Sequence, residues 1–299
     1  MANQTFTLKI PATEAPRLKQ FFLGHGFELR DLAHAFWQAK GLGCVASFYK
    51  SGKLVIQGPE ADTWRGLLGD DTPEARPYAS ALSKHPKPLP AAWGGTDEAG
   101  KGDYFGPLVI AGVVVKRDQL DLLQTLGIDD SKALSDERLP AMVQGIEAAC
   151  VTEVMVITPT KYNELYARIG NLNKLLAWAH GKIIERLLEQ TEAPYVLVDK
   201  FVDDRVLRRS LGPKGLAAHV ECRTKAEEDP AVGAASVLAR AAYLRNLRAM
   251  SRRLGVTLRP GAGAPTLRAG RSLVETHGKA VLQETAKLHF STTDQIGGR

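Results

Sequence analysis

GGTDEAGKGDYFGP, residues 94–107, is the stretch that decides the fold. Its two adjacent carboxylates, Asp97 and Glu98, are followed at once by glycines and then by an apolar, β-branched run over residues 108–115. Such a run predicts a buried strand. On a regular strand Asp97 and Glu98 would point to opposite faces. Both therefore serve one site only if the strand ends or bends there, and Gly100 and Gly102 would permit that bend.

Two other interpretations of this stretch stay open on the residues alone. The acids could form a solvated polar turn, as most carboxylates are solvated. Alternatively, residues 95–101 have the spacing of a phosphate-binding loop, G-x-x-x-x-G-K. Gly102 stands where that loop needs a serine or threonine, and the two acids would repel phosphates. A nucleotide triphosphatase is therefore disfavoured.

Outside this stretch, the chain divides around a proline-rich segment. Five prolines lie between residues 70 and 92, a density that disfavours both helix and central strand. We expect an N-terminal unit over residues 1–70, a linker over 71–92 and a catalytic domain over 93–299. In the first unit the pattern predicts strands over 6–10, 44–49 and 54–57, with a Ser51-Gly52 turn and a helix over 12–24.

The larger part of the chain alternates strands with helices. We predict strands over 108–115, 151–157 and 195–199, and helices over 135–149, 172–189, 230–254 and 272–286. A Gly/Pro/Arg loop is expected over 255–270. Strands separated by helices indicate an α/β domain with a mixed sheet.

The composition fits a globular protein with an anionic partner. Of the 299 residues, 44% are hydrophobic and 24% charged, and the formal net charge is +6. This excess of positive charge favours nucleic acid. Three widely spaced cysteines without a CxxC pair disfavour a disulfide framework or a zinc site and fit a reducing compartment. With no signal peptide or bilayer-length apolar run in view, we expect a cytoplasmic protein without a membrane partner.

Further acids stand where α/β sheets build their sites. Asp199 ends the predicted strand over 195–199, and Glu227 lies just before the helix that begins at Pro230. Each has a structural alternative, because Asp199 could cap a following helix and acids before Pro230 complement the helix dipole. If these acids converge with Asp97 and Glu98, they could hold hard divalent cations, which activate water in phosphodiester cleavage.

These segments resemble the ribonuclease HIII family, within the type 2 ribonucleases H. The resemblance rests on residues 97–107, VDKF at 198–201, KAE at 225–227 and AASVLAR at 234–240. DSKAL at 130–134, GNLN at 170–173 and AKLHF at 286–290 are similar to further family segments. The Gly-Lys-Gly loop and a glutamate as the fourth acid favour HIII over HII. Residues 39–58 resemble the family's extra substrate-binding domain, which has a TATA-binding-protein-like fold.

The resemblance implies a ribonuclease H-like fold and an activity. That activity is metal-dependent hydrolysis of the RNA strand of RNA–DNA hybrids, with two Mg²⁺ ions (Mn²⁺ as the alternative), by a monomer that leaves 5′-phosphate and 3′-hydroxyl ends. Its catalytic and metal-binding acids map to Asp97, Glu98, Asp199 and Glu227. The gap that follows Glu227 is one residue shorter than the family pattern, so Glu228 stays an alternative.

The resemblance also implies substrate contacts. Only the 2′-hydroxyl distinguishes RNA from DNA at a given nucleotide, and backbone groups can reach it where glycines leave space. Lysines are expected to meet phosphates, with a solvated surface position as the alternative. Tyr104 is expected near the hybrid, with a core position as the alternative. The histidines His180 and His289 are interpreted as structural. The expected substrate-binding residues are Gly100, Lys101, Gly102, Tyr104, Ser131, Lys132, Lys50 and Lys53.

Two rival functions remain. One is a structure-specific nuclease or resolvase of the same fold class acting on DNA, against which the Gly-Lys-Gly loop argues. The other is a nucleic-acid-binding protein without catalysis, against which the intact set of carboxylates argues.

Overall fold

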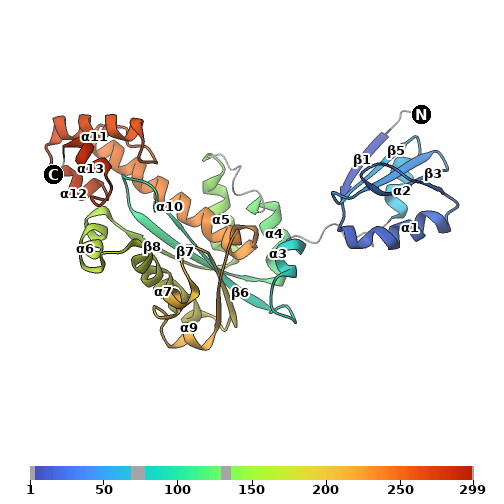
Figure 1. Ribbon diagram of the computed structural model, residues 1–299, viewed down its shortest axis with the longest axis horizontal. Coiled ribbons are helices and arrows are strands. Elements are labelled where there is room, and N and C mark those ends of the chain that lie inside the picture. The colour runs from blue at the N-terminus through green and yellow to red at the C-terminus, as the bar shows by residue number, and fades with distance from the viewer. Residues whose placement is uncertain (1–3, 69–77, 129–135, 298–299) are drawn as a thin grey trace. The chain divides into compact units, whose positions relative to one another are not determined.

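The computed structural model describes residues 4–68, 78–128 and 136–297 (Figure 1). The chain forms two compact units, Met1–Ala79 and Ser80–Arg299. Each has its own sheet and its own hydrophobic core, and each is described by itself below.

The first unit is a five-stranded antiparallel sheet in the order β1-β5-β4-β3-β2. Its core face packs against two helices, through Phe22 of α1 and Trp64 of α2. The predicted strands and turn are confirmed, whereas the helix expected over 12–24 is a short 3₁₀ turn followed by α1. The elements are β1 (Gln4–Lys9), α1 (Ala15–Gly24), β2 (Glu28–Arg30), β3 (Ala35–Gly41), β4 (Cys44–Tyr49), β5 (Lys53–Gly58) and α2 (Ala61–Leu67).

The second unit is built on a five-stranded mixed sheet in the order β10-β9-β6-β7-β8. Strands β6, β9 and β10 are mutually parallel, and β7 and β8 continue the sheet in antiparallel fashion. This confirms the predicted mixed α/β fold. The strands are β6 (Ala92–Ala99), β7 (Leu108–Lys116), β8 (Val151–Ile157), β9 (Tyr195–Asp199) and β10 (His219–Arg223).

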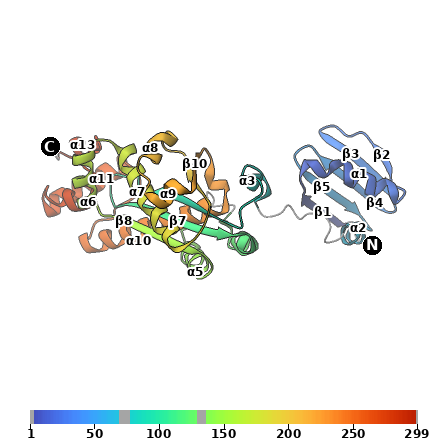
Figure 2. The ribbon, with the colours of Figure 1, turned by 90° about the horizontal axis from the view of Figure 1, so that it is seen from below.

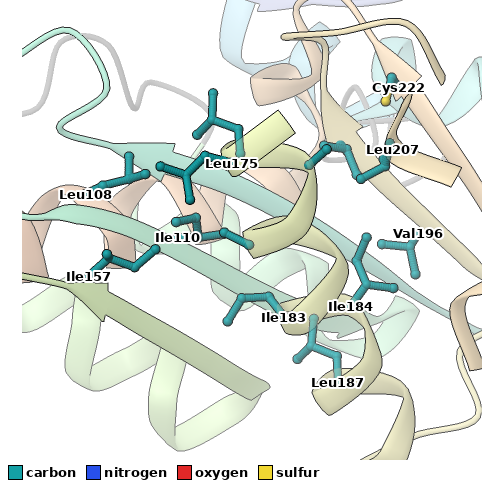
Figure 3. Close-up of a cluster of buried hydrophobic side chains, with 14 of the residues drawn as sticks. Leu108, Ile110, Ile157, Leu175, Ile183, Ile184, Leu187, Val196, Leu207 and Cys222 are labelled. Carbon is teal, nitrogen blue, oxygen red and sulfur yellow. The ribbon is translucent and has the colours of Figure 1, made fainter. Parts of the chain in front are cut away.

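Two long helices cover opposite faces of this sheet, α10 (Pro230–Leu254) and α7 (Leu172–Gln190) (Figures 1 and 2). Glycines allow the close approach on both sides. A Cβ on Gly95 would lie 2.3 Å from the backbone nitrogen of Val232 in α10, and one on Gly112 would lie 2.5 Å from Ile183 in α7. Figure 3 shows Ile183 and Leu187 of α7 among the side chains of this core.

The remaining helices correct part of the sequence prediction. The loop expected over 255–270 ends early, because Pro265 lies in the first turn of α11. The helix expected over 272–286 is split at Gly278, whose φ of 76° is outside the helical range. No helix among the described residues is long and apolar enough to cross a bilayer. Besides α7 and α10, the helices that follow α2 are α3 (Ala79–Ser83), α4 (Leu120–Thr125), α5 (Leu139–Ala149), α6 (Pro159–Ile169), α8 (Asp204–Arg208), α9 (Pro213–Ala217), α11 (Ala264–His277), α12 (Val281–Thr285) and α13 (Thr292–Ile296).

The stretch expected to be a linker, residues 71–92, differs from that expectation in its second half. Residues 71–77 lie outside the described part of the chain. Residues 80–92 belong to the second unit, where α3 forms ahead of the prolines and His85 is only 4% exposed. The prolines prevent a longer helix, but they do not prevent tertiary packing.

Candidate active site

Three parallel strands of the second unit end at the same edge of the sheet. Thr96 of β6 lies beside Val198 of β9, which places Asp97 next to Asp199 at the following position. Strand β10 runs parallel to β9, and the chain after β10 forms the 3₁₀ turn η4 (Ala226–Glu228), which contains Glu227. The fold therefore brings the predicted acids to one end of the sheet, where open α/β sheets bind ligands.

Asp97 and Glu98 lie on opposite faces of β6. Pairing with β7 continues in register through Ala99, and the strand ends there, one residue after Glu98, at the turn that Gly100 permits with its φ of 87°. The carboxylate of Asp97 accepts a hydrogen bond from Ser236 of α10. Glu98 points the other way, with Oε2 3.1 Å from Nε2 of His180 in α7. The alternation of the strand thus gives each acid a supporting side chain from a different helix. Glu98 still lies close enough to Asp97 and Asp199 to raise the pKa of both.

Asp97 is surrounded by negative charge. Burial raises its pKa, and the charges of Glu98 and Asp199 raise it further, to about 7. The Ser236 hydroxyl and the backbone N–H of Glu98, 2.8 Å from Oδ1, oppose the increase without cancelling it. A carboxyl group in this position holds its proton more tightly than a solvated one.

Glu98 is held by cations and donors instead. Burial raises its pKa, but the hydrogen bond and charge of His180, together with Lys101, outweigh burial and lower it to about 2. Lys101 Nζ lies 2.5 Å from Oε1. His180 is fully buried, and its Nδ1 lies 2.8 Å from the hydroxyl of Thr96. Because a carboxylate only accepts, His180 donates through Nε2, and a neutral ring would accept from Thr96 at Nδ1.

Asp199 links the strand ends to η4. Its Oδ1 accepts a hydrogen bond from Ala226 N at 3.0 Å. Burial raises the pKa of Asp199, and the charges of Glu227 and Glu98 add to the increase. The helix-capping alternative for Asp199 does not hold, because Asp203 caps α8.

Glu227 and Glu228 have different surroundings. Glu227 is half-buried and close enough to Asp199 to raise its pKa. The side chain of Glu228 is 51% exposed and lies 3.3 Å from Lys84 Nζ. Of the two glutamates, Glu227 is therefore the one that faces the other acids.

The donor set fits a hard divalent cation in its chemistry. Carboxylate oxygens are the ligands that Mg²⁺ and Mn²⁺ prefer, and a cation would relieve the repulsion that raises the pKa of Asp97 and Asp199. Within the described ranges, no three or more His, Cys, Asp or Glu side chains are arranged to hold a metal ion as they stand. The acids converge on one end of the sheet without closing on a single point.

Comparison with known proteins identifies the family. The family model described as Ribonuclease HII matches residues 94–293. Ribonuclease HIII of Protochlamydia amoebophila is 37% identical over 286 residues, which cover 95% of this chain and 94% of that protein. This chain belongs to the ribonuclease HIII family. Ribonuclease HIII of Chlamydia abortus is 36% identical, with 91% and 90% covered. The crystal structure of Bst-RNase HIII in complex with Mn²⁺ is similar at a TM-score of 0.68 and 28% identity, with 98% of both chains covered.

Membership of the ribonuclease HIII family fixes the class of activity. The chain is an endoribonuclease that cleaves the RNA strand of RNA–DNA hybrids, and the family depends on divalent metal. The phosphate-binding-loop alternative fails on the fold, because residues 95–99 lie within β6 rather than in a loop.

The two glycines of the ribonuclease HIII Gly-Lys-Gly loop differ in what they do. Gly100 has a φ of 87°, and a Cβ there would lie 2.3 Å from the carbonyl oxygen of Pro107, so the fold itself requires glycine. A Cβ on Gly102 would meet nothing within 4 Å. Lys101, expected to meet phosphate, is 43% exposed, and its ammonium pairs with Glu98. Gly102 is thus the loop position with open space beside it.

Tyr104 does not lie at the substrate surface, which corrects the prediction. It is fully buried, and its hydroxyl accepts a hydrogen bond from Thr293 Oγ1 at 3.2 Å. Its ring packs edge-on against Phe105 at 4.8 Å. A side chain enclosed in this way cannot stack on a nucleic acid.

The structure describes only some of the other residues that were predicted to bind substrate. Ser131 and Lys132 lie outside the described residues. Lys50 and Lys53 are exposed at the β4–β5 hairpin of the first unit, where Lys53 pairs in register with Lys9 of β1. Lys40 pairs in register with Val45, at the other end of β4.

Three residues that hold the acids in place were not recognised as such from the sequence. His180 contacts Glu98, Thr96 contacts His180 in turn, and Ser236 contacts Asp97. His180 sits among apolar residues on the buried side of α7, a pattern that indicates a polar partner without naming it. Only the packing of α7 on β6 shows that the partner is Glu98.

Proposed function

We propose that Asp97, Glu98, Asp199 and Glu227 hold divalent cations, Mg²⁺ or Mn²⁺, and that hydrolysis of the RNA strand takes place at this end of the sheet. The observation that carries the proposal is the convergence of these acids, from three parallel strand ends, in a chain of the ribonuclease HIII family. When bound, such cations activate a water molecule and stabilise the leaving oxygen.

The chain's own residues prepare this site. Ser236 fixes the carboxylate of Asp97 from the α10 side. His180, itself fully buried, fixes that of Glu98 from the α7 side. Backbone hydrogen bonding from Ala226 orients Asp199. Acids held in this way need little rearrangement when a cation binds.

The open space at Gly102 supports a role for the Gly-Lys-Gly loop in choosing RNA. Backbone groups of this loop can approach a 2′-hydroxyl where no side chain intervenes. Lys101 is partly exposed beside Glu98, so it can reach a phosphate next to the cleaved bond.

The experiment that tests the proposed function compares three substrates. Labelled RNA–DNA hybrid, duplex DNA and duplex RNA are incubated with the full chain, with Mg²⁺, with Mn²⁺ and with chelator. We expect cleavage of the hybrid's RNA strand alone, only with added metal, and with 5′-phosphate ends. Equal cleavage of duplex DNA would favour the rival nuclease or resolvase, and cleavage in chelator would exclude the metal site.

We also propose that the first unit holds the substrate. Over residues 4–68 of the first unit, no helix covers the sheet face opposite α1 and α2. Polar and charged side chains lie along it, including Thr7, Gln57 and Lys40. Lys53 and Lys9 lie at the other end of the same face. Lysines at both ends of an open face suit contact with successive phosphates along one backbone.

The salt dependence of binding tests this role. Lys53→Ala in the full chain should weaken hybrid binding and reduce the slope of log affinity against log salt by about 0.9 for a lost phosphate contact. The matched control is Lys19→Ala, an exposed lysine on α1, which covers the other face. Equal effects of the two variants would show that the open face has no special role.

We further propose that the chain acts as a monomer in the cytoplasm. All four acids come from one chain, so the site needs no second copy. The three cysteines, Cys44, Cys150 and Cys222, are buried and unpaired, which suits a reducing compartment.

A further inference from the structure

The segment that leads into β6, residues 80–90, is anchored beside η4. We call it the lead-in segment. Its residue His85 is buried, with Nε2 2.6 Å from Oδ2 of Asp229. The ring packs edge-on against Trp93 and Tyr195, with ring centroids 5.1 Å and 5.0 Å apart. A proline-rich stretch therefore carries a histidine into the core of the second unit.

Asp229 forms several hydrogen bonds at this contact. Besides His85, it accepts hydrogen bonds from Trp93 Nε1 at 3.1 Å and from Ala231 N at 2.9 Å. It caps α10, and its own backbone N–H donates to Ala226 O at 2.8 Å, which closes η4. One buried carboxylate thus fixes the start of α10 and the end of the turn that contains Glu227.

The flanking contacts point the same way. Arg223 donates to the carbonyl oxygen of Lys84 at 3.0 Å, and Lys84 Nζ lies 3.3 Å from Glu228. Lys84 therefore contacts the chain before η4 and within it, and its neighbour His85 contacts Asp229 directly after η4. Contacts of this kind stabilise a turn and also hold it in one position relative to the lead-in segment.

Opposing contacts hold η4 at its two ends. At its start, Ala226 N donates to Asp199, one of the four acids. At its end lies Asp229, which is hydrogen-bonded to His85. Lys225, just before η4, has a φ of 56°, a left-handed conformation that a lysine keeps only where the surrounding structure imposes it. A change at Asp229 would therefore move Glu227 relative to Asp199.

We propose that His85, acting through Asp229, is a positioning residue that sets Glu227 against Asp199. This inference rests on the proposed function, in which Glu227 is the fourth acid. It also makes the lead-in segment part of the catalytic unit rather than a spacer. His85 touches none of the four acids, so its effect is confined to the position of η4.

The test uses His85→Ala in the full chain, with kcat and KM for the hybrid measured separately. Loss of a group that orients a metal ligand costs roughly 10- to 100-fold in activity or metal affinity. We expect that loss in kcat, a KM within about twofold, and weaker binding of Mn²⁺ alone by calorimetry. An unchanged kcat and Mn²⁺ affinity would overturn the proposal.

A matched control separates positioning from general stability. Glu185 is another carboxylate that accepts backbone N–H groups at a helix start, those of Lys214 and Gly215 in α9. Glu185→Ala should lower the melting temperature by an amount similar to His85→Ala while leaving kcat unchanged. If Glu185→Ala lowered kcat equally, the effect of His85 would be one of stability alone, and the proposal would fail.

Rescue by a conservative variant gives a second, independent reading. Asp229→Asn keeps an oxygen for Trp93 and Ala231, and its amide can donate to Nε2 once the ring proton moves to Nδ1. That atom has no hydrogen-bond partner among the described residues. We expect Asp229→Asn to keep kcat within about threefold of wild type and Asp229→Ala to lose it as His85→Ala does. Equal activity of the two Asp229 variants would contradict the positioning role.

Glu227→Gln, measured in parallel, distinguishes the failure of this inference from that of the proposed function. If Glu227→Gln stays active, Glu227 is not the fourth acid and the proposed site fails. If Glu227→Gln is inactive while His85→Ala is normal, the site stands and the positioning role is wrong. If both lose activity and Asp229→Asn does not, both proposals are supported.

Discussion

The two faces of β6 at its carboxyl end give opposite properties to two neighbouring acids. On the α10 side, Asp97 meets a hydroxyl and other carboxylates, and its pKa rises to about 7. On the α7 side, Glu98 meets His180 and Lys101, and its pKa falls to about 2. Both side chains are largely buried, so burial alone does not separate them. The difference lies in which charges and donors each face supplies.

This difference shows where a cation would contribute most. The protein already balances the charge of Glu98 with its own side chains. On the other side, burial and the charges of Glu98 and Asp199 raise the pKa of Asp97, and burial and the charges of Glu227 and Glu98 raise that of Asp199. Pairs of titratable groups whose surroundings move their pKa values apart are typical of active sites.

The largest expected effect is a loss of activity when an acid on the Asp97 side of β6 is replaced. Asp199→Asn keeps the hydrogen bond from Ala226 but removes a charged oxygen, so cleavage should fall by more than the roughly 100-fold that loss of a group behind a metal ligand can cost. Hybrid binding should persist, because cationic side chains elsewhere supply affinity. Gel-based cleavage and filter binding measure the two quantities. Full activity in a folded variant would remove Asp199 from the site.

The next effect tests which glutamate completes the acidic side. Glu227→Gln should reduce the metal-dependent rate about 100-fold or more, because Glu227 faces Asp199. Glu228→Gln should stay within roughly fivefold, since its exposed pair with Lys84 is worth about 0–1 kcal/mol. Initial rates in Mg²⁺ and Mn²⁺ decide between them. The reverse order would assign the fourth acid to Glu228.

A smaller effect tests the Glu98 side. His180→Leu removes the donor to Glu98 and should lower kcat by roughly 10- to 100-fold. His180→Gln, which can still donate to the carboxylate, should recover part of that loss. Steady-state rates with a saturating hybrid give the comparison. Two variants of equal activity would show that the hydrogen bond to Glu98 does not matter for catalysis.

The smallest effect is on stability and has opposite signs at the two acids. The folded pKa of Asp97 lies above its unfolded value of 3.8, so the folded chain binds more protons and loses stability as pH rises from about 4 to 7. Asp97→Asn in chelator should therefore raise the melting temperature at pH 8 by a few degrees more than at pH 5. The folded pKa of Glu98 is about 2, so its charged form stabilises the fold above pH 4.5.

Glu98→Gln serves as the counterpart measurement. It should lower the melting temperature at both pH values, because the native charge has partners in His180 and Lys101. Thermal unfolding with chelator at pH 5 and pH 8 tests both variants together. Shifts of the same sign for Asp97→Asn and Glu98→Gln at pH 8 would contradict the contrast between the two faces.

Elements with a strong local pattern were predictable from the sequence. The apolar runs that became β8 and β9 and the helix that became α10 have the predicted bounds. Their apolar residues match the period of one structure type over a long enough stretch. Short or polar elements such as β3 and β10, and the start of α11, were missed because tertiary pairing outweighs weak local preference there.

The lead-in segment shows the limit of composition. Prolines 86, 88 and 90 indicated a spacer, and nothing in the local pattern marks His85 as a core residue. Its burial depends on Asp229, more than a hundred residues later in the chain. Tyr104 is the converse case, since an aromatic residue beside the Gly-Lys-Gly loop is buried and contacts Thr293.

The sequence by itself indicated which residues form the candidate site. The acid-bearing segments around Asp97, Asp199 and Glu227, their order and their positions at predicted strand and helix ends indicated both the family and an acidic site. Only the tertiary structure decided how those acids behave. A pKa depends on charges, donors and burial within a few ångströms. Glu98 acts on Asp97 from the next position in the chain, but His180, which acts on Glu98, and Ser236 and Asp199, which act on Asp97, come from elements far apart in the sequence.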